Sequence, residues 1–508
     1  MIYKVKSCTL MGLEGNMIEV EADASMGLPA FDIVGLPDAS VKEAKDRVRS
    51  AIKNCSFSFP AKRYTVNLAP SGIKKEGSLF DLPIAVAILG ATEQIEVKKE
   101  NFVMIGELSL SGEVRGVAGV LPLILSAAEK GFENFIVPKS NAAEAALAKG
   151  ANIYPVENLY QCTAFLQGEE EIEKYEVDIE KVFTADGEYD FDFSEVKGQS
   201  AAKRALEITA AGGHNCLIIG TPGSGKSMLA KRLPSILPDM TIEEALETTK
   251  IYSVAGLLKE NGALVTKRPF RSPHHTISTI GLVGGGAIPK PGELSLSHNG
   301  VLFLDELPEF KNDATEVMRQ PMEDGKVNLT RVAASVTYPS KCMVVAAMNP
   351  CKCGYYGEKS GRCRCSEASI KRYLSKVSGP LLDRIDISVE ASEISYAELK
   401  VSGGESSAEI KKRVVAAREI QRKRYEGESF HSNAGLDGDK IEKYCTLTKS
   451  AEELIKNAYA SMGLSARGYS RILKVSRTIA DLEGCENINE MHIAEAISYR
   501  SVDKKFWN

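Results

Sequence analysis

The sequence predicts an α/β protein of about three domains, the last of which is α-helical. At roughly 100–200 residues per domain, 508 residues are too many for a single core. Strand-like and helix-like runs alternate as far as about residue 390, and only helical periodicity follows. Hydrophobic residues make up 44% of the chain and charged residues 26%, which leaves enough apolar material for several cores.

The first domain is expected over residues 1–165 as a mixed α/β unit. Its strands are expected where apolar residues alternate or cluster with β-branched ones, and its helices where apolar residues recur with helical spacing. The expected strands are residues 17–23, 63–70, 101–108 and 134–138, and the expected helices are residues 39–54, 82–94 and 141–150.

Residues 166–194 are expected to form an acidic linker. From Glu169 to Glu195 the chain has twelve acidic residues and two lysines. Like charges at this density repel one another, and few aliphatic side chains are present to build a core.

A second α/β domain is expected over residues 195–390 and a helical domain over residues 391–508. Apolar strands of the second domain are expected at residues 216–220, 301–306 and 342–350. Glycines interrupt the helical pattern of the third domain. Its expected helices are residues 406–427, 450–463, 469–484 and 491–500.

Composition restricts the compartment and the partners. The first residues lack a basic segment followed by an apolar one, and no apolar run approaches the roughly 20 residues of a membrane span. We therefore expect a cytoplasmic protein with no membrane partner. Lys and Arg total 63 against 68 Asp and Glu, a net charge of −5, so a nucleic acid would have to be held by local basic patches. Eleven cysteines without a secretory leader predict reduced thiols.

A phosphate-binding loop is expected directly after the strand at residues 216–220. The segment GTPGSGKS fits the pattern G-x-x-x-x-G-K-[ST] and precedes a helix-like run. In such a loop, backbone N–H groups converge on phosphate oxygens, Lys226 reaches the β- and γ-phosphates, and Ser227 binds Mg²⁺. An ordinary glycine-rich turn is the alternative. The expected nucleotide-binding residues of the loop are Gly220, Thr221, Pro222, Gly223, Ser224, Gly225, Lys226 and Ser227.

Polar residues end the next two apolar strands. Asp305 and Glu306 follow VLFL, and Asn349 follows MVVAAM. Because the carboxyl ends of parallel strands meet at one edge of a sheet, we expect these side chains beside the phosphate loop. Asp305 would hold Mg²⁺ through water, Glu306 would activate the attacking water as general base, and Asn349 would orient that water. Solvated strand-end acids and a turn-capping amide are the alternatives.

The order of strand, phosphate loop, acidic strand, Asn-ended strand and helical unit resembles the AAA+ ATPases, whose cofactors are ATP and Mg²⁺. The resemblance implies that Arg384, in LLDRID, acts as an arginine finger on the γ-phosphate of a neighbouring subunit; an ion pair with a neighbouring aspartate is the alternative. It also implies that Arg467, in SARGYSRILKVSR, is the sensor arginine of the lid, with Arg471 as second candidate. Because a finger needs a neighbour, the resemblance implies a homo-oligomeric ring, with six subunits expected.

Nearly eighty residues separate Ser227 from Asp305, more than a crossover needs, so inserted loops are expected. Such loops would line a pore and contact a DNA backbone without reading its sequence; a solvated basic face is the alternative. The two histidines are expected to form structural hydrogen bonds rather than to bind a metal, because no third ligand of the right type lies nearby. The polar residues in question are Lys267, Arg268, Arg271, His274, His275 and Lys290.

The strings KRPFRSPHHTIS, GVLFLDELPEF, GPLLDRID and ARGYSRILKVSRTIADLEG resemble the magnesium-chelatase-like AAA+ ATPases, and closely the ComM (YifB) family. The resemblance spans nearly the whole chain. It implies a helicase-like ring motor that promotes branch migration of DNA during homologous recombination, including natural transformation.

Four cysteines lie directly after Asn349. Cys351, Cys353, Cys363 and Cys365 form two C-x-C pairs separated by nine residues. Two close pairs bridged by a glycine-containing loop can converge on one structural Zn²⁺, which would leave no open position for catalysis. Reduced thiols without metal are the alternative, because C-x-C is tighter than the usual ligand spacing.

The segments KKEGSLFDLPIAVAIL and GELSLSGEVRGVAGVLPLILSAAEKGFENFIVP resemble the ribosomal-S5-like domain of Lon-type proteases. The positions of the protease serine and lysine fall near Leu79 and Leu121, and a leucine cannot transfer a proton. We therefore expect a non-proteolytic domain for assembly or DNA binding, with hydrolysis dependent on Ser78 as the alternative. A chelatase-type ATPase that remodels a protein partner is the other function that the sequence leaves open.

Overall fold

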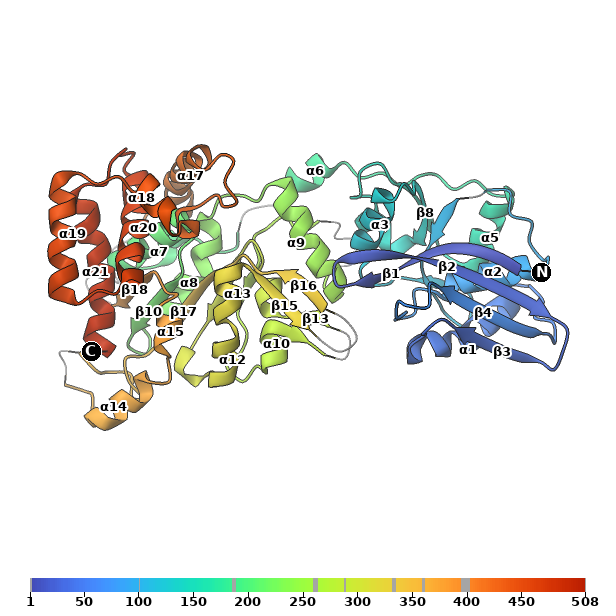
Figure 1. The fold of residues 1–508 in the computed structure, drawn as a ribbon, viewed down its shortest axis with the longest axis horizontal. Coiled ribbons are helices and arrows are strands. Elements are labelled where there is room, and N and C mark those ends of the chain that lie inside the picture. Colours follow the sequence, from blue (N-terminus) through green and yellow to red (C-terminus); the bar gives the residue numbers. More distant parts are fainter. Residues whose placement is uncertain are drawn as a thin grey trace. The chain divides into compact units, whose positions relative to one another are not determined.

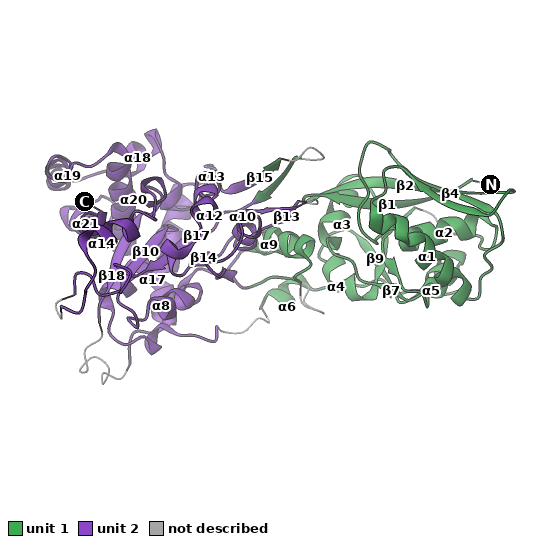
Figure 2. Cartoon of the chain, turned by 90° about the horizontal axis from the view of Figure 1, so that it is seen from below, with its two compact units in different colours: residues 1–186, 241–266, 328–338 green, residues 187–240, 267–327, 339–508 purple. Residues whose placement is uncertain are grey.

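The structure is a computed structural model that describes residues 2–99, 101–184, 189–258, 264–286, 289–330, 335–358, 361–393 and 403–507. The chain forms two compact units (Figure 2). Unit 1 contains residues 1–186, 241–266 and 328–338, and unit 2 contains residues 187–240, 267–327 and 339–508. Two segments of the stretch expected as the second α/β domain therefore belong to unit 1.

Unit 1 is built on a mixed seven-stranded sheet (Figure 1). Its strands are β1 (Ile2–Met11), β2 (Glu14–Ser25), β3 (Ala30–Val34), β4 (Arg63–Ala69), β5 (Phe102–Met104), β8 (Asn134–Pro138) and β9 (Asn152–Val156), with β6 (Glu107–Leu108) and β7 (Val114–Arg115) as a separate small hairpin. The sheet order is β3-β4-β2-β1-β5-β8-β9. The pairs β1/β2 and β2/β4 are antiparallel, and the other neighbours are parallel.

The described part of unit 1 also contains helices, several of which pack on this sheet. They are α1 (Ala39–Asn54), α2 (Asp81–Ala91), α3 (Val120–Glu129), α4 (Ala142–Ala145), α5 (Leu159–Gln167), α6 (Ile179–Thr184) and α9 (Ile242–Ala255), with a 3₁₀ turn η1 (Lys139–Asn141). The side chain of Asp38 caps α1 by accepting from the Val41 N–H. Every residue of α2 is buried: Asp81 pairs with Arg47, and the rest of the helix is apolar on all faces and packs on β1 and β2.

Helix α9 reaches unit 1 from the inserted stretch and packs on α3. The Gly119 N–H donates to the Ser253 carbonyl at 3.0 Å. The buried Glu144 carboxylate accepts from the Ser253 hydroxyl and, at 2.9 Å, from the Leu121 N–H. These bonds join α9 to the segments around α3 and α4.

Unit 2 has a five-stranded parallel sheet. Its strands are β10 (Cys216–Gly220), β11 (Phe270–Arg271), β14 (Val301–Leu304), β17 (Met343–Met348) and β18 (Ile387–Ala391), and a short pair joins β12 (Gly284–Gly285) to β13 (Lys290–Pro291). A second pair joins β15 (Lys326–Thr330) to β16 (Ser335–Pro339), and its residues 328–338 belong to unit 1. The sheet order is β11-β14-β17-β10-β18. All four neighbouring pairs are parallel, so every strand ends at the same edge. The three strands expected from the sequence are confirmed.

The described part of unit 2 also contains helices, several of which pack on this sheet. They are α7 (Ser200–Gly212), α8 (Lys226–Arg232), α10 (Thr279–Val283), α11 (Glu293–Leu296), α12 (Asn312–Val317), α13 (Arg319–Asp324), α14 (Glu367–Leu374) and α15 (Gly379–Leu382), with 3₁₀ turns η2 (Phe193–Glu195), η3 (Leu233–Ile236) and η4 (Leu307–Glu309). Helix α7 packs against β10 and β18.

The carboxyl-terminal part of unit 2 is a helical lid. Its helices are α17 (Ser407–Arg424), α18 (Asp439–Tyr444), α19 (Lys449–Met462), α20 (Ala466–Leu482) and α21 (Glu490–Trp507), with a 3₁₀ turn η5 (Asn433–Gly435). A capping box between Ser406 and Glu409 starts α17. Helix α20 packs on α21 and α7, so the lid shares a core with the sheet layer. The predicted fold class is confirmed: an α/β core with a helical lid, preceded in the sequence by a mixed α/β unit.

None of the helices in the described ranges is both long enough and apolar enough to cross a lipid bilayer.

The end of the acidic linker docks into the core of unit 2. Phe193 is fully buried and belongs to the main apolar cluster, which also contains residues of α7 and β18. Asp192 accepts from the Ser407 N–H at 3.0 Å, and its carbonyl accepts from Arg232 at 2.9 Å. Composition alone predicts a linker here, but the buried Phe193 and the hydrogen bonds of Asp192 anchor its end.

Replacement of Phe193 by Ala should destabilise unit 2 by about 3–5 kcal/mol, because the change removes a buried ring and leaves a cavity. Phe191→Ala is the matched control, since Phe191 is exposed, and it should cost much less. Thermal and urea unfolding of both variants measure the difference. Equal losses would contradict the anchoring role of Phe193.

Candidate functional site

The candidate site lies at the carboxyl edge of the parallel sheet of unit 2. Strand β10 leads into the phosphate loop, β14 into Asp305 and Glu306, and β17 into Asn349. Because these strands are parallel and adjacent to one another in the order β14-β17-β10, the segments after them emerge side by side.

The phosphate loop has the conformation and the open space that phosphate binding needs. Gly223 and Gly225 have φ values of +79° and +85°, and a Cβ added to either would meet no atom within 4 Å. The hydroxyls of Thr221 and Ser224 are buried and have no hydrogen-bond partner within the described part of the chain. Buried hydroxyls normally have partners, so these two donors beside an open glycine loop fit the phosphates of a nucleotide.

Lys226 is folded back onto the loop. Its ammonium donates to the carbonyls of Gly220 (2.8 Å) and Thr221 (2.9 Å) and to Asn349 Oδ1 (3.1 Å). Burial lowers the pKa of Lys226, against the opposing effect of the nearby Asp305 and Glu306 carboxylates. The amide predicted to orient water and the lysine predicted to hold phosphate are therefore in direct contact.

Ser227 and Asp305 form the second contact of the site. The Ser227 hydroxyl donates to Asp305 Oδ2 at 2.6 Å. A hydroxyl and a carboxylate are hard oxygen ligands of the kind that Mg²⁺ takes at phosphate sites, directly or through water. This pair fits a magnesium ion bound beside a nucleotide.

Glu306 stands next to this pair in a strained backbone conformation. Its φ is +54°, uncommon for a residue other than glycine, and its N–H donates to Asp305 Oδ1 at 3.0 Å. Its exposed carboxylate lies 3.3 Å from His275 Nδ1. His275 follows β11, which pairs with β14, and its ring lies 4.1 Å from that of His274.

Sequence reasoning assigned the two histidines structural hydrogen bonds and did not connect His275 with Glu306. The contact depends on the pairing of β11 with β14. Strand β11 has only two residues, too few for a periodic signal.

The basic residues of the insert have different environments. Arg268 donates to the carbonyls of Pro238 (2.5 Å), Asn299 (2.7 Å) and Asp239 (3.2 Å), and Arg271 forms a two-bond ion pair with Glu293. Both guanidiniums therefore hold the fold of unit 2 together. Lys267 lies 5.6 Å from the centre of the Tyr189 ring. Lys290, on the β12/β13 hairpin, and His274 are exposed.

Arg384 is held within its own chain in this structure. Its guanidinium donates to the carbonyls of Arg319 (3.0 Å) and Pro380 (2.6 Å) and is paired with Glu323, and its side chain is 12% exposed. To act on a neighbouring subunit it has to leave these partners.

The two lid arginines differ sharply. The side chain of Arg467 is 67% exposed and lies 3.8 Å from Asp383, whereas that of Arg471 is 6% exposed. Arg471 donates to the carbonyls of Leu382 (2.9 Å) and Ile385 (3.0 Å) and to the Asp383 carboxylate (2.9 Å). Arg471 thus ties α20 to the segment that carries Arg384, and Arg467 is the accessible one.

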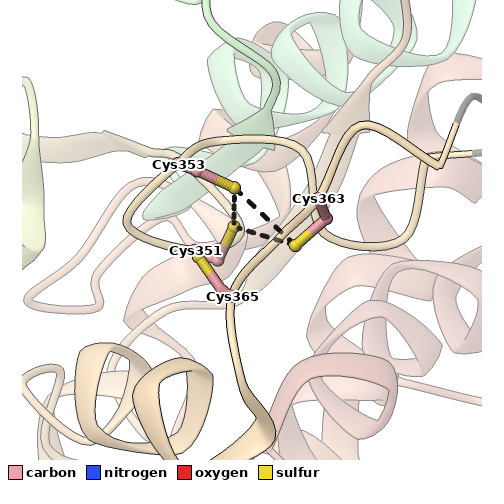
Figure 3. A group of neighbouring side chains, drawn as sticks. All are labelled: Cys351, Cys353, Cys363 and Cys365. Carbon is pink, nitrogen blue, oxygen red and sulfur yellow. Dashed lines mark hydrogen bonds between the residues drawn. The ribbon is translucent and has the colours of Figure 1, made fainter.

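The four clustered cysteines converge (Figure 3). Cys351 Sγ lies 3.3 Å from Cys353 Sγ and 3.8 Å from Cys363 Sγ, and the latter two are 3.7 Å apart. All four sulfurs, including that of Cys365, lie within 4.8 Å of one another. Burial alone would raise the pKa of Cys353, but hydrogen bonds from the Tyr355 backbone and the Cys351 side chain lower it to about 6.

Gln199 contacts the phosphate loop and was missed from the sequence. Its side-chain amide donates to the carbonyls of Ser224 (2.9 Å) and Ser392 (2.5 Å), and its φ is +59°. A single glutamine before a helix carries no sequence signal for this role.

In unit 1 the protease-like positions are apolar. Leu79 and Leu121 are buried. The Ser78 hydroxyl, one residue from the first of them, donates to the Glu107 carboxylate. An acceptor carboxylate without a lysine is not the base of a Ser–Lys pair, so this contact gives no support to proteolysis.

Family models match three parts of the chain. Residues 192–399 match "Magnesium chelatase, subunit ChlI", residues 20–141 match "Subunit ChlI of Mg-chelatase", and residues 404–500 match "Magnesium chelatase, subunit ChlI C-terminal". The first model covers the candidate site and the four cysteines.

Curated relatives extend over almost the whole chain. Competence protein ComM of Haemophilus influenzae is 45% identical over 98% of this chain and 97% of the relative. The uncharacterized protein YifB of Escherichia coli is 45% identical over 97% and 96%. The magnesium-chelatase 67 kDa subunit of Chlorobaculum parvum is 29% identical over 31% of this chain and 23% of the relative.

Removal of the Lys226 ammonium should weaken ATP binding by about 10- to 100-fold, because charge-assisted hydrogen bonds to phosphate are lost. Calorimetric titration of Lys226→Ala with ATP and Mg²⁺ measures the change. Lys231→Ala is the control, because Lys231 is exposed on the same helix, α8. Equal dissociation constants for both variants would contradict the assignment of the site.

Proposed function

Because this chain belongs to the ComM/YifB family of magnesium-chelatase-like AAA+ ATPases, we propose that it is an ATP-hydrolysing ring motor that acts on DNA. The proposed activity is branch migration during homologous recombination, including natural transformation. The observation that carries the ATP-hydrolysis part of the proposal is the convergence of Lys226, Asp305 and Asn349 at the edge of one parallel sheet. The word "competence" in the name of the Haemophilus relative supports the transformation context.

The phosphate loop would bind the triphosphate, and Ser227 and Asp305 would hold Mg²⁺. ATP supplies the transferable phosphoryl group, and Mg²⁺ offsets its negative charge. Lys226 would exchange the carbonyls of its own loop for phosphate oxygens. That exchange leaves the Asn349 amide beside the terminal phosphate, where it would orient water.

Glu306 would accept the proton of the attacking water. An exposed carboxylate at the end of β14 suits this role, because it can reach a water molecule in the open part of the site. His275 Nδ1 lies 3.3 Å from one carboxylate oxygen of Glu306, and this contact would restrict the direction in which Glu306 points. The positive φ of Glu306 is consistent with a residue whose position matters more than its local stability.

Glu306→Gln should keep ATP binding close to that of the unaltered protein and lower kcat by about 10²–10⁴-fold, because an amide cannot accept the proton. Glu309→Gln is the control, since Glu309 is an exposed acid three residues away that pairs with Lys376. Steady-state phosphate release and nucleotide titration separate the two effects. Unchanged turnover would remove Glu306 from its role.

The ring is proposed to be a homo-hexamer in which Arg384 acts on the neighbouring site and Arg467 senses the nucleotide bound by its own subunit. The exposure of Arg467 supports its part, and the contacts of Arg471 with residues 382–385 give the lid a direct connection to the segment of Arg384. A structural Zn²⁺ at the four cysteines, supported by their spacing, completes the proposed cofactors.

DNA contact is proposed for the inserted loops. Lys290 on the β12/β13 hairpin is the exposed cation that supports it, whereas Arg268 and Arg271 serve the fold. Contacts to phosphates alone would bind DNA of any sequence. The partial match to a magnesium-chelatase subunit supports a second candidate function. In that alternative, the ATPase remodels a protein partner and does not act on DNA.

A synthetic four-way junction tests the DNA function. We expect junction DNA to stimulate ATP hydrolysis, strand exchange to require ATP, and both to weaken as salt rises, because phosphate contacts release counterions. Glu306→Gln should bind the junction without moving strands. Hydrolysis that is indifferent to DNA at every salt concentration would favour protein remodelling over DNA movement.

A further inference from the structure

The segment that carries the four cysteines begins at the candidate site itself. We call its described residues, 350–358 and 361–366, the cysteine knuckle. Asn349, which bonds Lys226, is followed by Pro350 and then by Cys351, which is fully buried. Any constraint on the knuckle is therefore transmitted to Asn349 through two covalent links.

The sulfur positions fit one tetrahedral metal ion. A Zn–S distance of about 2.3 Å gives sulfur–sulfur separations of about 3.8 Å at tetrahedral angles. The separations of Cys351, Cys353 and Cys363 are 3.3, 3.8 and 3.7 Å. A disulfide would need about 2.05 Å, so these thiols are grouped without being joined.

The knuckle also packs on the phosphate loop. A Cβ added to Gly354 would lie 2.5 Å from Cδ and 2.6 Å from Cγ of Pro222, so the bare backbone of Gly354 touches the loop residue. Gly354 has a φ of +87°, which side chains rarely adopt. Both space and backbone conformation require glycine at this contact.

The knuckle also contacts the last helix of the lid. The rings of Tyr356 and Phe506 lie 6.3 Å apart with their planes at 63°. On the same end of α21, Trp507 Nε1 donates to the Leu374 carbonyl at 3.1 Å and Lys505 pairs with Glu390 at 2.8 Å. The knuckle is thus joined to Asn349 after β17 and contacts both the phosphate loop and helix α21.

We propose that the cysteine knuckle is a zinc-dependent brace whose loading sets the affinity of the ATP site. The knuckle contains Gly354, Gly357 and Gly361, all with positive φ, and without a cross-link such a segment samples many conformations. Bound zinc would restrict the knuckle to one conformation. It would thereby fix the positions of Pro222, Asn349 and Phe506 relative to one another. Loss of zinc would increase the mobility of the phosphate loop and remove its connection through the knuckle to α21. This inference rests on the proposed ATP-binding function.

Zinc content and nucleotide affinity test the brace. Protein purified without chelator should contain about one zinc per chain by elemental analysis, which also separates zinc from iron. Cys363→Ser with Cys365→Ser removes the two ligands farthest in sequence from Asn349, and it should abolish zinc binding and weaken ATP binding roughly tenfold. Cys55→Ser, a half-buried cysteine of unit 1, is the control and should change neither.

Two further measurements keep the test independent of folding. Reversible removal of zinc from the unaltered protein by a chelator should weaken ATP binding, and added Zn²⁺ should restore it. Gly354→Ala should retain zinc yet weaken ATP binding, because the methyl group presses on Pro222. Circular dichroism identifies any variant that fails to fold.

The outcomes are distinct. Absence of zinc in the unaltered protein, with four titratable thiols, overturns the metal site. Zinc that can be removed with no change in ATP affinity overturns the brace. Failure of the unaltered, zinc-loaded protein to bind ATP overturns the proposed function instead, because zinc content is measured without nucleotide or DNA.

Discussion

The parallel pairing of β10 with both β17 and β18 is the constraint on which the rest of unit 2 depends. Ile218 pairs with Ala347 on one side and with Val389 on the other, and all five residues of β10 are buried. This pairing makes the phosphate loop, Asn349 and the segment after β18 leave the sheet at one edge. An antiparallel neighbour would place its polar strand end at the opposite edge, more than ten ångströms away over a strand of this length.

Much of this arrangement could be predicted from the sequence, because the signals are local. The helix expected at residues 39–54 is α1 with the same bounds, since its apolar spacing and its Asp38 cap both lie within the segment. The strands before the phosphate loop, Asp305 and Asn349 are continuous apolar runs, as buried parallel strands are. The glycines of residues 220–227 identify the phosphate loop in the sequence, so its position directly after β10 could be predicted.

The features that the sequence did not reveal depend on tertiary contacts. Whether a cation serves a ligand or the fold is decided by what surrounds it, and nothing in the string KRPFR tells that Arg268 and Arg271 are bound by carbonyls and by Glu293. The same holds for Arg467 and Arg471, which lie four residues apart on the same face of α20 and both approach Asp383, although the first is exposed and the second is buried. His275 meets Glu306 because two short segments pair as strands. The roles of Arg384 and Arg467 stay predictions.

Helix α9 has a consequence for how the protein can be divided. The chain passes between the two units five times, at residues 186/187, 240/241, 266/267, 327/328 and 338/339. A single protease cut in the acidic linker would leave four covalent connections intact. A gene fragment that starts at residue 187 would encode α9 without α3, and so would expose the face that α3 covers. Unit 2 therefore cannot be separated from unit 1 by a single cut or expressed alone as one continuous segment. A chimera that exchanges unit 1 between relatives would also have to exchange residues 241–266 and 328–338.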